Sequence, residues 1–554
     1  MAKRVAVIGA GSSGLVTVKE LLDEGHVPTC FERAGGPGGV FRFGEVDGVV
    51  WESCRLTSSV PLTAFSDFPD PSGRTGHLTI GEYVEYLTAY AESFGVTPHV
   101  RFDTTVEAVT PDPAAGWTVR TRDGRGVHEE SYDAVAICSG LHQHPHIPHF
   151  PGEETFTGLI LHSAHYRRPA QVAGRKVLVV GAGESGADVV AEVARHAAET
   201  VLSLRRGVAA QPRRMFGVPK DYLTSRILNS ASHWVFQTRN PKDDRKRRVY
   251  KLAFIPLVVL DKVLQLAYRF FWEFVPLFFS RKPGEIRANL KTRRLTVQLL
   301  KESRGTVNEQ FGTKTDDFVR AMAVGRCRRV PAIARFEGSR VTFEDGSHFD
   351  PDVVLLCTGF DTRLPFLDDE IAAAPRYLHA FHPDIGPALA FIGFLRPAFG
   401  AIPPLAELQA RWFALLVSDK VQLPAADVMR ESIAYWTEFR SHVFRAVEER
   451  LEYLVDHTVF CDELASQVGC KPTWRAIRQE KPGFRLRFFA APFAAAQYRL
   501  VGPHARPELA RAVINGLPIT HPLPDLINLY MRWTMSRILH GVLGREYAPK
   551  LALN

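Results

Sequence analysis

Cysteine is scarce in this chain, with seven residues among 554, and no two of them form a C-x-x-C pair. A small, odd and scattered set argues against a disulfide-braced secreted domain and against a zinc site, and it is typical of free thiols in a reducing compartment. A strand-like run begins at Arg4, close behind Met1. Because this spacing leaves no room for a signal peptide, we expect a cytoplasmic protein.

Repeats and low-complexity tracts are also missing. No segment recurs at a period of about 20 to 50 residues, which excludes solenoids and propellers. Hydrophobic residues make up 45% of the chain and charged residues 23%, as in ordinary globular proteins of two or three domains. The formal charge of +8 suits anionic cofactors, but no nucleic-acid-binding motif accompanies the basic clusters, so we expect no nucleic acid partner.

One stretch, residues 252–279, is strongly apolar and aromatic but is interrupted by charges. The charged residues are Asp261, Lys262, Arg269 and Glu273. Because charges are costly at the centre of a bilayer, we do not expect a simple spanning helix. Two interpretations stay open for a helical insertion at about 240–290. It is either a hairpin in peripheral contact with a membrane or a lid over the protein and an apolar substrate.

A glycine-rich turn follows the first strand-like run, Arg4–Ile8. A helix-like stretch, Leu15–Gly25, comes next, and a second strand-like run, Val27–Phe31, leads directly to Glu32. This order is typical of a βαβ dinucleotide-binding unit. The residues of the turn that we expect to contact the cofactor are Gly9, Ala10, Gly11, Ser12, Ser13 and Gly14.

Each part of this unit has a physical task. The first glycine permits the tight turn, the second lets a pyrophosphate approach the backbone, and the third lets the helix pack closely on the strand. The N–H groups at the start of the helix attract the phosphates. Glu32 can accept hydrogen bonds from both ribose hydroxyls of a nucleotide.

The same order recurs at Lys176–Val180. A second G-x-G-x-x-G turn and a helix-like stretch follow, and the next strand-like run, Thr200–Leu204, precedes Arg205 and Arg206. A carboxylate there would repel a 2′-phosphate, whereas a guanidinium can bind it through two hydrogen bonds, so we predict NADPH rather than NADH. The cofactor contacts that we expect in the turn and helix are Gly181, Gly183, Glu184, Ser185, Gly186, Ala187 and Asp188.

Two dinucleotide sites in one chain predict an electron relay, because NADPH donates a hydride that a flavin can accept. We therefore expect an α/β fold with two Rossmann-like dinucleotide-binding domains, one for FAD and one for NADPH, with a helical insertion and a helical C-terminal region. The FAD domain would comprise residues 1–165 and 336–430. Residues 166–335 would form the NADPH domain, and residues 431–554 a mostly helical region.

Phe156, Gly158, His162 and Tyr166 form the pattern F-x-G-x-x-x-H-x-x-x-Y between the two units. This pattern resembles the identifying motif of flavin-containing monooxygenases, which are class B flavoprotein monooxygenases. Related Baeyer–Villiger enzymes usually end the motif in Trp followed by Pro or Asp, whereas Arg167 follows here. The placement of His162, in a linker before a strand, favours a structural or domain-orienting role over proton transfer.

Shorter stretches over roughly residues 3–425 are similar to the same family. They are Glu32–Arg33 with Gly38–Phe41, Phe65–Pro69, Ser185–Asp188, Cys357–Phe360, Phe391–Gly393 and Glu407–Trp412. Further cofactor contacts that the resemblance implies are Arg33, Gly39, Val40, Phe41, Thr358, Gly359 and Gln409.

The resemblance also implies a mechanism. NADPH reduces FAD, O2 adds to the flavin to give a C4a-hydroperoxide, and nitrogen or sulfur of a small lipophilic molecule attacks it. The protein positions the reactants and excludes water. Two alternatives stay open, namely Baeyer–Villiger oxygenation of a ketone and a non-oxygenating NADPH oxidase or flavin reductase. A homodimer would be the commonest assembly.

One position departs from the family. Alignment of the neighbouring stretches places Thr57 where an active-site Asn is usual, and we expect Thr57 and Ser58 to act in catalysis and to contact the cofactors. A threonine hydroxyl has one proton to donate, whereas a carboxamide both donates and accepts. We therefore predict a shorter-lived hydroperoxide or a reshaped active site.

Four histidines precede the motif and raise the question of a metal. They are His142, His144, His146 and His149. Pro145 and Pro148 break their spacing, and no cysteine or carboxylate cluster joins them. The family uses no metal, so we expect a loop there without a metal ion.

Overall fold

The computed structural model describes residues 2–44, 49–113, 116–215, 217–228, 283–303, 312–398, 400–443 and 453–520, with a few single positions beyond them. The apolar stretch 252–279 lies outside the described residues, apart from Val259 and Val263, so both interpretations of it stay predictions. Within the described part of the chain, no helix has the length and apolar character needed to cross a membrane.

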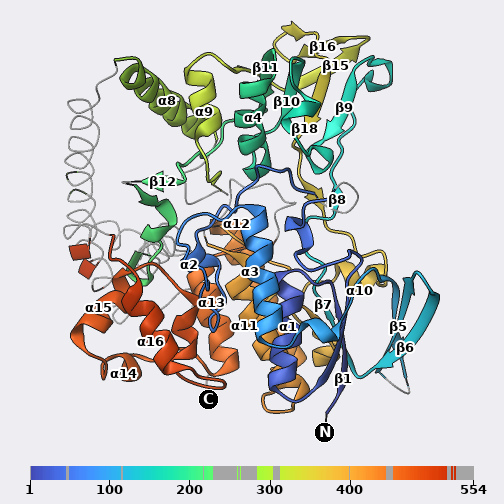
Figure 1. Ribbon diagram of the computed structural model, residues 1–554, viewed down its shortest axis with the longest axis vertical. Coiled ribbons are helices and arrows are strands. Elements are labelled where there is room, and N and C mark those ends of the chain that lie inside the picture. Colours follow the sequence, from blue (N-terminus) through green and yellow to red (C-terminus); the bar gives the residue numbers. More distant parts are fainter. Residues whose placement is uncertain are drawn as a thin grey trace.

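Two five-stranded parallel sheets organise the chain, one in the lower and one in the upper half of Figure 1. The first sheet consists, in spatial order, of β20 (Leu389–Phe391), β7 (Ala134–Ile137), β1 (Arg4–Ile8), β2 (Val27–Phe31) and β3 (Val100–Arg101). The second consists of β14 (Arg328–Val330), β11 (Glu199–Ser203), β10 (Lys176–Val180), β18 (Val353–Leu356) and β9 (Leu159–His162). The prediction of two Rossmann-like units is confirmed.

The central strands owe their place to apolar, β-branched sequences. β7 and β18 are buried along their whole length, and β1 is buried after Arg4. Both faces of a parallel sheet are covered by other elements, so its strands favour such apolar residues. The helix α1 (Ser12–Asp23) connects β1 to β2, and α4 (Glu184–His196) connects β10 to β11. Each helix therefore begins at the carboxyl end of a central strand.

Sheet membership differs from the expected domain bounds at two places. β9 precedes residue 166 and β18 follows residue 335, yet both belong to the second sheet, where β18 pairs with β10 and with β9. The second sheet thus extends from Leu159 to Leu356. Pairing between strands distant in sequence decides sheet membership, and local sequence patterns do not reveal such pairing.

Smaller elements complete the two halves. Near the first sheet are α2 (Val60–Thr63), α3 (Ile80–Ser93), α10 (Asp369–Ala373) and a sheet of β4 (Thr105–Asp112), β5 (Gly116–Asp123) and β6 (Gly126–Tyr132). Near the second are α8 (Pro283–Glu302), α9 (Asp317–Ala323) and a sheet of β15 (Ile333–Glu337), β16 (Arg340–Phe343) and β17 (His348–Phe349). The segments that link the halves pair through β8 (His144–Pro145) and β19 (Phe360–Asp361).

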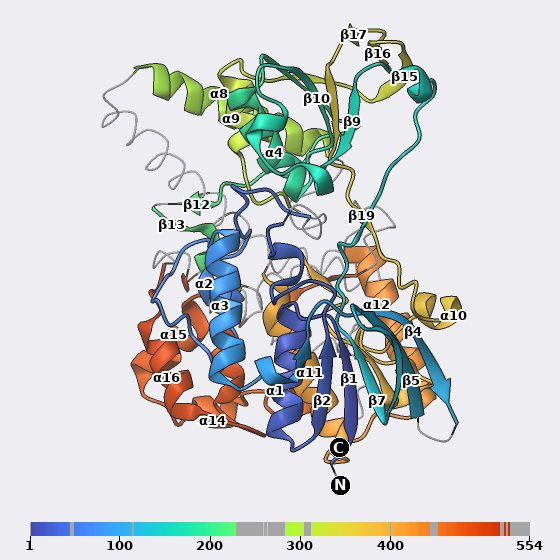
Figure 2. The same ribbon diagram turned by 45° about the vertical axis from the view of Figure 1, so that its right-hand side comes forward.

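The C-terminal part of the chain is mostly helical, as expected. It contains α11 (Ile402–Val417), α12 (Ala426–Val443), α13 (His457–Val468), α14 (Trp474–Ile477), α15 (Pro482–Ala490) and α16 (Pro507–Gly516), with β21 (Arg396–Pro397) paired to β22 (Leu454–Val455). α11 is buried from Pro403 to Val417, and it lies beside α1 (Figures 1 and 2).

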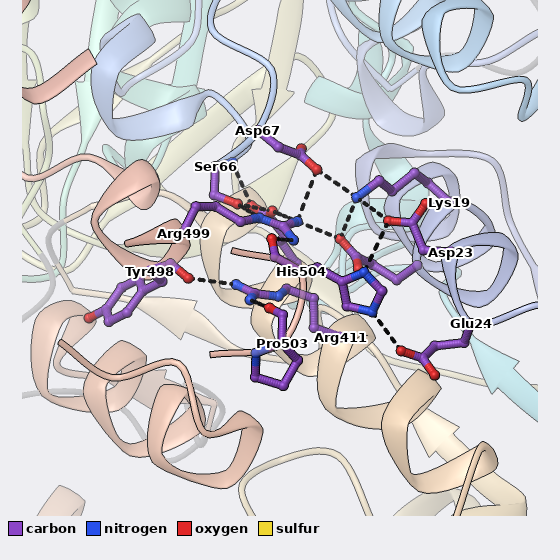
Figure 3. A network of polar contacts seen from close by, with 12 residues as sticks. Lys19, Asp23, Glu24, Ser66, Asp67, Arg411, Tyr498, Arg499, Pro503 and His504 are labelled. Atoms are coloured by element: carbon purple, nitrogen blue, oxygen red, sulfur yellow. Dashed lines mark hydrogen bonds and ion pairs between the residues drawn. The ribbon is translucent and has the colours of Figure 1, made fainter. Parts of the chain in front are cut away.

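A buried ionic cluster joins this C-terminal region to the first unit (Figure 3). The Arg499 guanidinium is fully buried and contacts three carboxylates, those of Glu20 on α1 at 2.6 Å, Glu407 on α11 at 2.9 Å and Asp67 at 3.0 Å. Lys19 contacts Glu20 and Asp67 as well. Burial alone would raise the pKa of Glu20, but Arg499 and Lys19 outweigh it and lower that pKa to about 2. The ion pairs of this cluster therefore attach α1 to α11 and to the segment that contains Arg499.

Candidate functional site

A cavity of about 480 Å³ is lined by residues of both units. From the first unit come the glycine turn, the end of β2 and the loop that contains Thr57. From the second come Glu184, Ser185 and Asp188, all in the first turns of α4. Ligands of open α/β sheets bind at the carboxyl ends of the strands. The cavity thus has the position expected of a site shared by two nucleotides.

The first glycine turn has the geometry that a pyrophosphate requires. Gly9 adopts a φ of 101°, which favours glycine, and its N–H donates to the Phe31 carbonyl at 2.8 Å. A Cβ on Gly14 would lie 1.7 Å from the Gly9 carbonyl oxygen, so only glycine lets α1 pack this closely. No described side chain caps the N-terminus of α1 at Gly11. The N–H groups of its first turn can therefore face a phosphate.

Glu32 lies at the end of β2 beside this turn and is 7% exposed. Its carboxylate accepts hydrogen bonds from the N–H groups of Ala10, at 2.7 Å, and Ala34, at 2.9 Å. These bonds fix the carboxylate in the cavity wall. A carboxylate offers roughly four lone-pair sites, so acceptor capacity remains for ribose hydroxyls. The first turn and Glu32 together fit an adenine dinucleotide.

A second loop closes on the first turn. Gly39–Phe41 forms a short 3-10 helix, and a Cβ on Gly39, whose φ is 55°, would lie 3.1 Å from the Gly11 Cα. Phe41 packs edge-on against Tyr83 with ring centroids 5.1 Å apart. The family-like stretch 38–41 is thus brought against the glycine turn. The cavity wall includes Arg33, Gly39, Val40 and Phe41.

The second turn repeats the geometry of the first. Gly181 has a φ of 96°, and a Cβ on Gly186 would lie 2.3 Å from the Gly181 carbonyl oxygen. α4 begins after Gly183, again without a described side-chain cap. Arg205 and Arg206 follow β11 and lie at the same edge of the sheet, because Ser203 pairs with Val180. They are placed near the turn but outside the cavity wall.

Thr57 and Ser58 lie together in the cavity wall. Thr57 is half-buried, and the Ser58 and Thr63 hydroxyl oxygens are 2.8 Å apart. The next residue, Ser59, is fully buried, and its N–H donates to Asp221 Oδ2 at 2.6 Å. The loop that carries Thr57 is therefore held by two hydrogen bonds, one between the Ser58 and Thr63 hydroxyls and one from the Ser59 N–H to Asp221.

The motif between the units joins this loop region to α4. A buried hydrogen bond of 2.7 Å runs from the Tyr166 hydroxyl to Glu192, and Glu192 also accepts from the Ser53 hydroxyl. His162 accepts from the Ala164 N–H at 3.0 Å through Nδ1, and burial lowers the pKa of His162 to about 4. A neutral imidazole bonded to the backbone supports the structural role expected for it.

Comparison with known proteins identifies the family. A model of the flavin-binding monooxygenase-like family matches residues 2–238 and 277–518. The chain belongs to this family. The resemblance seen in the sequence is thereby confirmed, and the chain is an oxidoreductase of the monooxygenase type.

Relatives of this flavin-binding monooxygenase differ in the reactions that they carry out. A 4-hydroxybenzoate brominase (decarboxylating) from Pseudoalteromonas luteoviolacea (strain 2ta16) is 32% identical over 548 residues, 97% of this chain and 98% of the relative. The N-oxide-forming dimethylaniline monooxygenase 2 of Rattus norvegicus is 32% identical over 522 residues, 91% of this chain and 89% of the relative. The S-allyl-L-cysteine S-oxygenase from Allium sativum shares the fold, with a TM-score of 0.58 at 22% identity over 97% of this chain and 99% of that chain.

Eleven expected cofactor contacts of this monooxygenase lie outside the cavity wall, namely Ala10, Gly14, Gly181, Gly183, Gly186, Ala187, Arg205, Arg206, Thr358, Gly359 and Gln409. Gln409 is fully buried, accepts from the Gly393 N–H at 2.9 Å and donates to the Leu378 carbonyl at 3.0 Å. It thus fixes Gly393, which does line the cavity. Thr358 and Gly359 bond to His146 in the linking segment. Thr358 and Gly359 therefore hold the linking segment rather than the cavity wall.

The four histidines before the motif are dispersed. His142 and His144 line the cavity, whereas His146 pairs with Asp361 at 2.9 Å and His149 with Glu153 at 2.7 Å. In the part of the chain that the structure describes, the one group of three potential metal ligands is Glu20, Asp67 and Glu407. The Arg499 guanidinium contacts all three carboxylates, so ion pairs account for that group.

Sequence patterns missed three charged residues at the site. The Lys314 N–H donates to Glu184 at 3.2 Å, and the Lys314 ammonium lies 3.7 Å from the same carboxylate. Arg213 pairs with Asp188, and Arg396 lines the cavity with Lys314. None of these residues stands at a fixed spacing from a glycine turn, so no local signal in the sequence marked them.

Proposed function

We propose that this protein is an NADPH-dependent FAD monooxygenase that oxygenates nitrogen or sulfur of a small lipophilic molecule. The observation that carries the proposal is that one cavity is lined by the first glycine turn, by Glu184 and Ser185 of the second turn and by Thr57. Such a cavity would place the two nucleotides close together in one space. We assign the first sheet to the FAD domain and the second, with residues 159–356, to the NADPH domain.

The residues of the chain would divide the work of holding the two nucleotides. N–H groups at the start of α1 would bind the FAD pyrophosphate, and Glu32 would bind its ribose. The start of α4 would bind the NADPH pyrophosphate, and Arg205 and Arg206 its 2′-phosphate. The bound flavin supplies the electrons and the activated oxygen.

The protein itself then needs to position the substrate and exclude water rather than supply a strong acid or base. Thr57 and Ser58 lie in the wall of the same cavity. Because the Ser58 hydroxyl is paired with that of Thr63, Thr57 is the better candidate for a hydrogen bond to a cofactor or to the reacting oxygen. Its single proton limits it to one such donation.

The test of the proposal is a substrate screen in which oxygenated product, NADPH consumption and hydrogen peroxide are measured together. A sulfide or a tertiary amine should yield one oxygenated product per NADPH, and a cyclic ketone should yield little lactone. Complete release of the electrons as hydrogen peroxide with every substrate would contradict the proposal and favour an NADPH oxidase.

Replacement of Thr57 by Asn addresses the departure from the family at the same site. Because a carboxamide both donates and accepts, Thr57→Asn should raise the share of NADPH that ends in product by about 2- to 10-fold, the effect of roughly one hydrogen bond. Thr105→Asn, also in the cavity wall, is the control. If the share of NADPH that ends in product is unchanged in Thr57→Asn, residue 57 does not control oxygen transfer.

A second candidate is bromination of a phenolic carboxylate. The similarity to the brominase covers 97% of this chain, against 91% for the dimethylaniline monooxygenase, and the cavity wall carries Lys314 and Arg396. Cationic side chains would attract bromide, itself a soft nucleophile, and a carboxylate. Mass spectrometry after incubation with NADPH, bromide and 4-hydroxybenzoate tests this candidate. Brominated phenol would establish it, and its absence alongside sulfoxide formation would exclude it.

A further inference from the structure

A short hairpin lies between the two units and bonds to both. It consists of β12 (Arg214–Met215) and β13 (Val218–Pro219), and Figure 2 shows it between α4 above and α2 below. The Lys220 N–H donates to the Arg213 carbonyl at 2.8 Å, which closes the base of the hairpin. Two charged side chains, those of Arg213 and Asp221, extend from this base.

One side of the base binds the second unit. The Arg213 guanidinium pairs with Asp188, and both side chains are largely buried. Asp188 lies in the second turn of α4 and lines the cavity. The part of α4 that would sense the phosphates of NADPH is thus joined directly to the hairpin.

The other side of the base binds the first unit. Asp221 Oδ2 accepts from the Ser59 N–H at 2.6 Å, a short bond to a fully buried backbone group. Thr57 and Ser58, which line the cavity, immediately precede Ser59. A buried N–H that loses its acceptor is costly, so the bond restricts the positions that this loop can adopt.

A third contact ties the two sides together. The His77 ring lies 3.3 Å, through Nε2, from the Arg213 carbonyl oxygen. Gly76, the residue before it, accepts from the Val60 N–H at 3.0 Å. The loop around Thr57 is therefore connected to the base of the hairpin through two separate paths, of which Asp221 is the direct one.

We propose that Asp221 is a positioning residue that fixes the Thr57–Ser58 loop, and that the hairpin transmits occupancy of the NADPH site to this loop through Arg213. The second half rests on the proposed function, since it assigns NADPH to α4. In the proposed reaction the bound nicotinamide nucleotide restricts this loop further, which limits futile reaction of the reduced enzyme with O2.

Two substitutions of Asp221 distinguish its hydrogen bond with the Ser59 N–H from its negative charge. Asp221→Ala removes the acceptor of the Ser59 N–H, whereas Asp221→Asn keeps one acceptor oxygen. The carboxamide has nearly the shape of the carboxylate but no charge, and burial, which raises the pKa of the Asp221 carboxyl, disfavours its charged form. Asp352→Ala is the matched control, because Asp352 also accepts from a backbone N–H, that of Lys176 at 2.7 Å, at the opposite end of the second sheet.

Hydrogen–deuterium exchange of the FAD-loaded protein, with and without NADP⁺, tests the proposal without relying on turnover. In Asp221→Ala the peptide that contains Ser59 should exchange about 10-fold faster, whereas Asp221→Asn and Asp352→Ala should stay within about 3-fold of the parent. NADP⁺ should slow exchange of that peptide in the parent and in Asp221→Asn but not in Asp221→Ala. Equal exchange in Asp221→Ala and Asp352→Ala would overturn the proposal.

Arg213→Ala provides an independent arm if Asp221→Ala does not fold. It leaves the bond of Ser59 to Asp221 in place, so exchange without NADP⁺ should match the parent and only the response to NADP⁺ should be lost. A full response in Arg213→Ala would contradict transmission through the hairpin.

Rates of NADPH oxidation and of product formation test the role of Asp221 separately from the proposed function. Asp221→Ala should oxidise NADPH at a rate within about 3-fold of the parent but convert about 5-fold less of it into product, with rescue by Asp221→Asn. If the parent itself forms no oxygenated product, the proposed function fails, while the exchange data still decide the role of Asp221.

Discussion

Two buried glutamates stand at equivalent positions of the two glycine-turn helices, Glu20 on α1 and Glu192 on α4, yet different partners hold them. Glu20 is bound by the charges of Lys19 and Arg499, and Arg499 comes from the far end of the chain. Glu192 is bound by two neutral hydroxyls, those of Tyr166 and Ser53. The same local motif is thus attached by ion pairs in one unit and by ordinary hydrogen bonds in the other.

The difference agrees with the nucleotides that we propose for the two units. A flavin that stays bound through many turnovers requires a fixed site, whereas NADPH must enter and leave in each cycle. At equivalent positions of the two turns, Gly11 is half-buried and Ser13 is buried, whereas Gly183 is exposed and Ser185 is half-buried. We infer that the first unit is built for retention and the second for exchange.

The largest expected effect comes from Arg499→Met. It leaves three buried carboxylates without their common cation, which should lower the free energy of unfolding by about 3–5 kcal/mol and release FAD on mild heating. Tyr166→Phe, the counterpart in the second unit, should cost about 1 kcal/mol and leave FAD bound. Thermal unfolding with flavin fluorescence measures both. Equal losses of unfolding free energy in the two variants would contradict the difference between the two units.

Replacement of the third glycine of each turn by alanine tests the two units separately. The new Cβ would lie 1.7 Å from a carbonyl oxygen in Gly14→Ala and 2.3 Å in Gly186→Ala, and such overpacking typically costs about 1–3 kcal/mol, occasionally more. Gly14→Ala should therefore lose FAD, and Gly186→Ala should keep FAD but bind NADPH weakly. Flavin content and an NADPH titration measure the outcome. Gly25→Ala, with no atom near its Cβ position but a positive φ, controls for strain alone.

Asp188 has no charged equivalent in α1, where Val16 occupies the corresponding position, so it should make the second unit sensitive to pH. Burial raises the pKa of Asp188 to about 6, despite the neighbouring Arg213. The folded protein then binds a proton that the unfolded chain releases, so the free energy of unfolding should fall as pH rises from about 4 to 6 and level off above.

Urea unfolding of the parent and of Asp188→Asn without nucleotide measures this dependence. The variant should gain about 2–3 kcal/mol relative to the parent between pH 4 and pH 8. Parallel pH curves for the two proteins would show that Asp188 is not the group responsible.

The smallest effect concerns the ends of the second strands, where Glu32 of the first unit is matched by Arg205 and Arg206. Replacement of both arginines by Ala should raise the KM for NADPH about 10- to 100-fold, the range of one to two charge-assisted hydrogen bonds, and leave that for NADH nearly unchanged. Steady-state kinetics with both nucleotides tests this. A parallel rise for NADH would indicate a general loss of binding rather than recognition of the 2′-phosphate.

The comparison also shows what the sequence can predict. Both glycine turns and Glu32 follow from local spacing, because a βαβ unit fixes which residues meet at the end of a strand. Thr57, which lies in the cavity wall, was singled out only by the resemblance to the family. Arg499 and Lys314 were missed, and no local pattern indicated that β9 and β18 pair in the second sheet. These depend on contacts between distant segments, which no periodicity records. Gln409 shows the intermediate case, since its stretch was singled out but its side chain acts through Gly393.

The central claim is that FAD and NADPH are held side by side in one cavity, and anaerobic titration of the purified protein with NADPH tests it most directly. The account predicts a yellow protein with one FAD per chain, whose flavin absorbance is bleached by one equivalent of NADPH and far more slowly by NADH. A colourless protein that takes up no FAD on reconstitution, or a bound flavin that NADPH leaves oxidised, would contradict it.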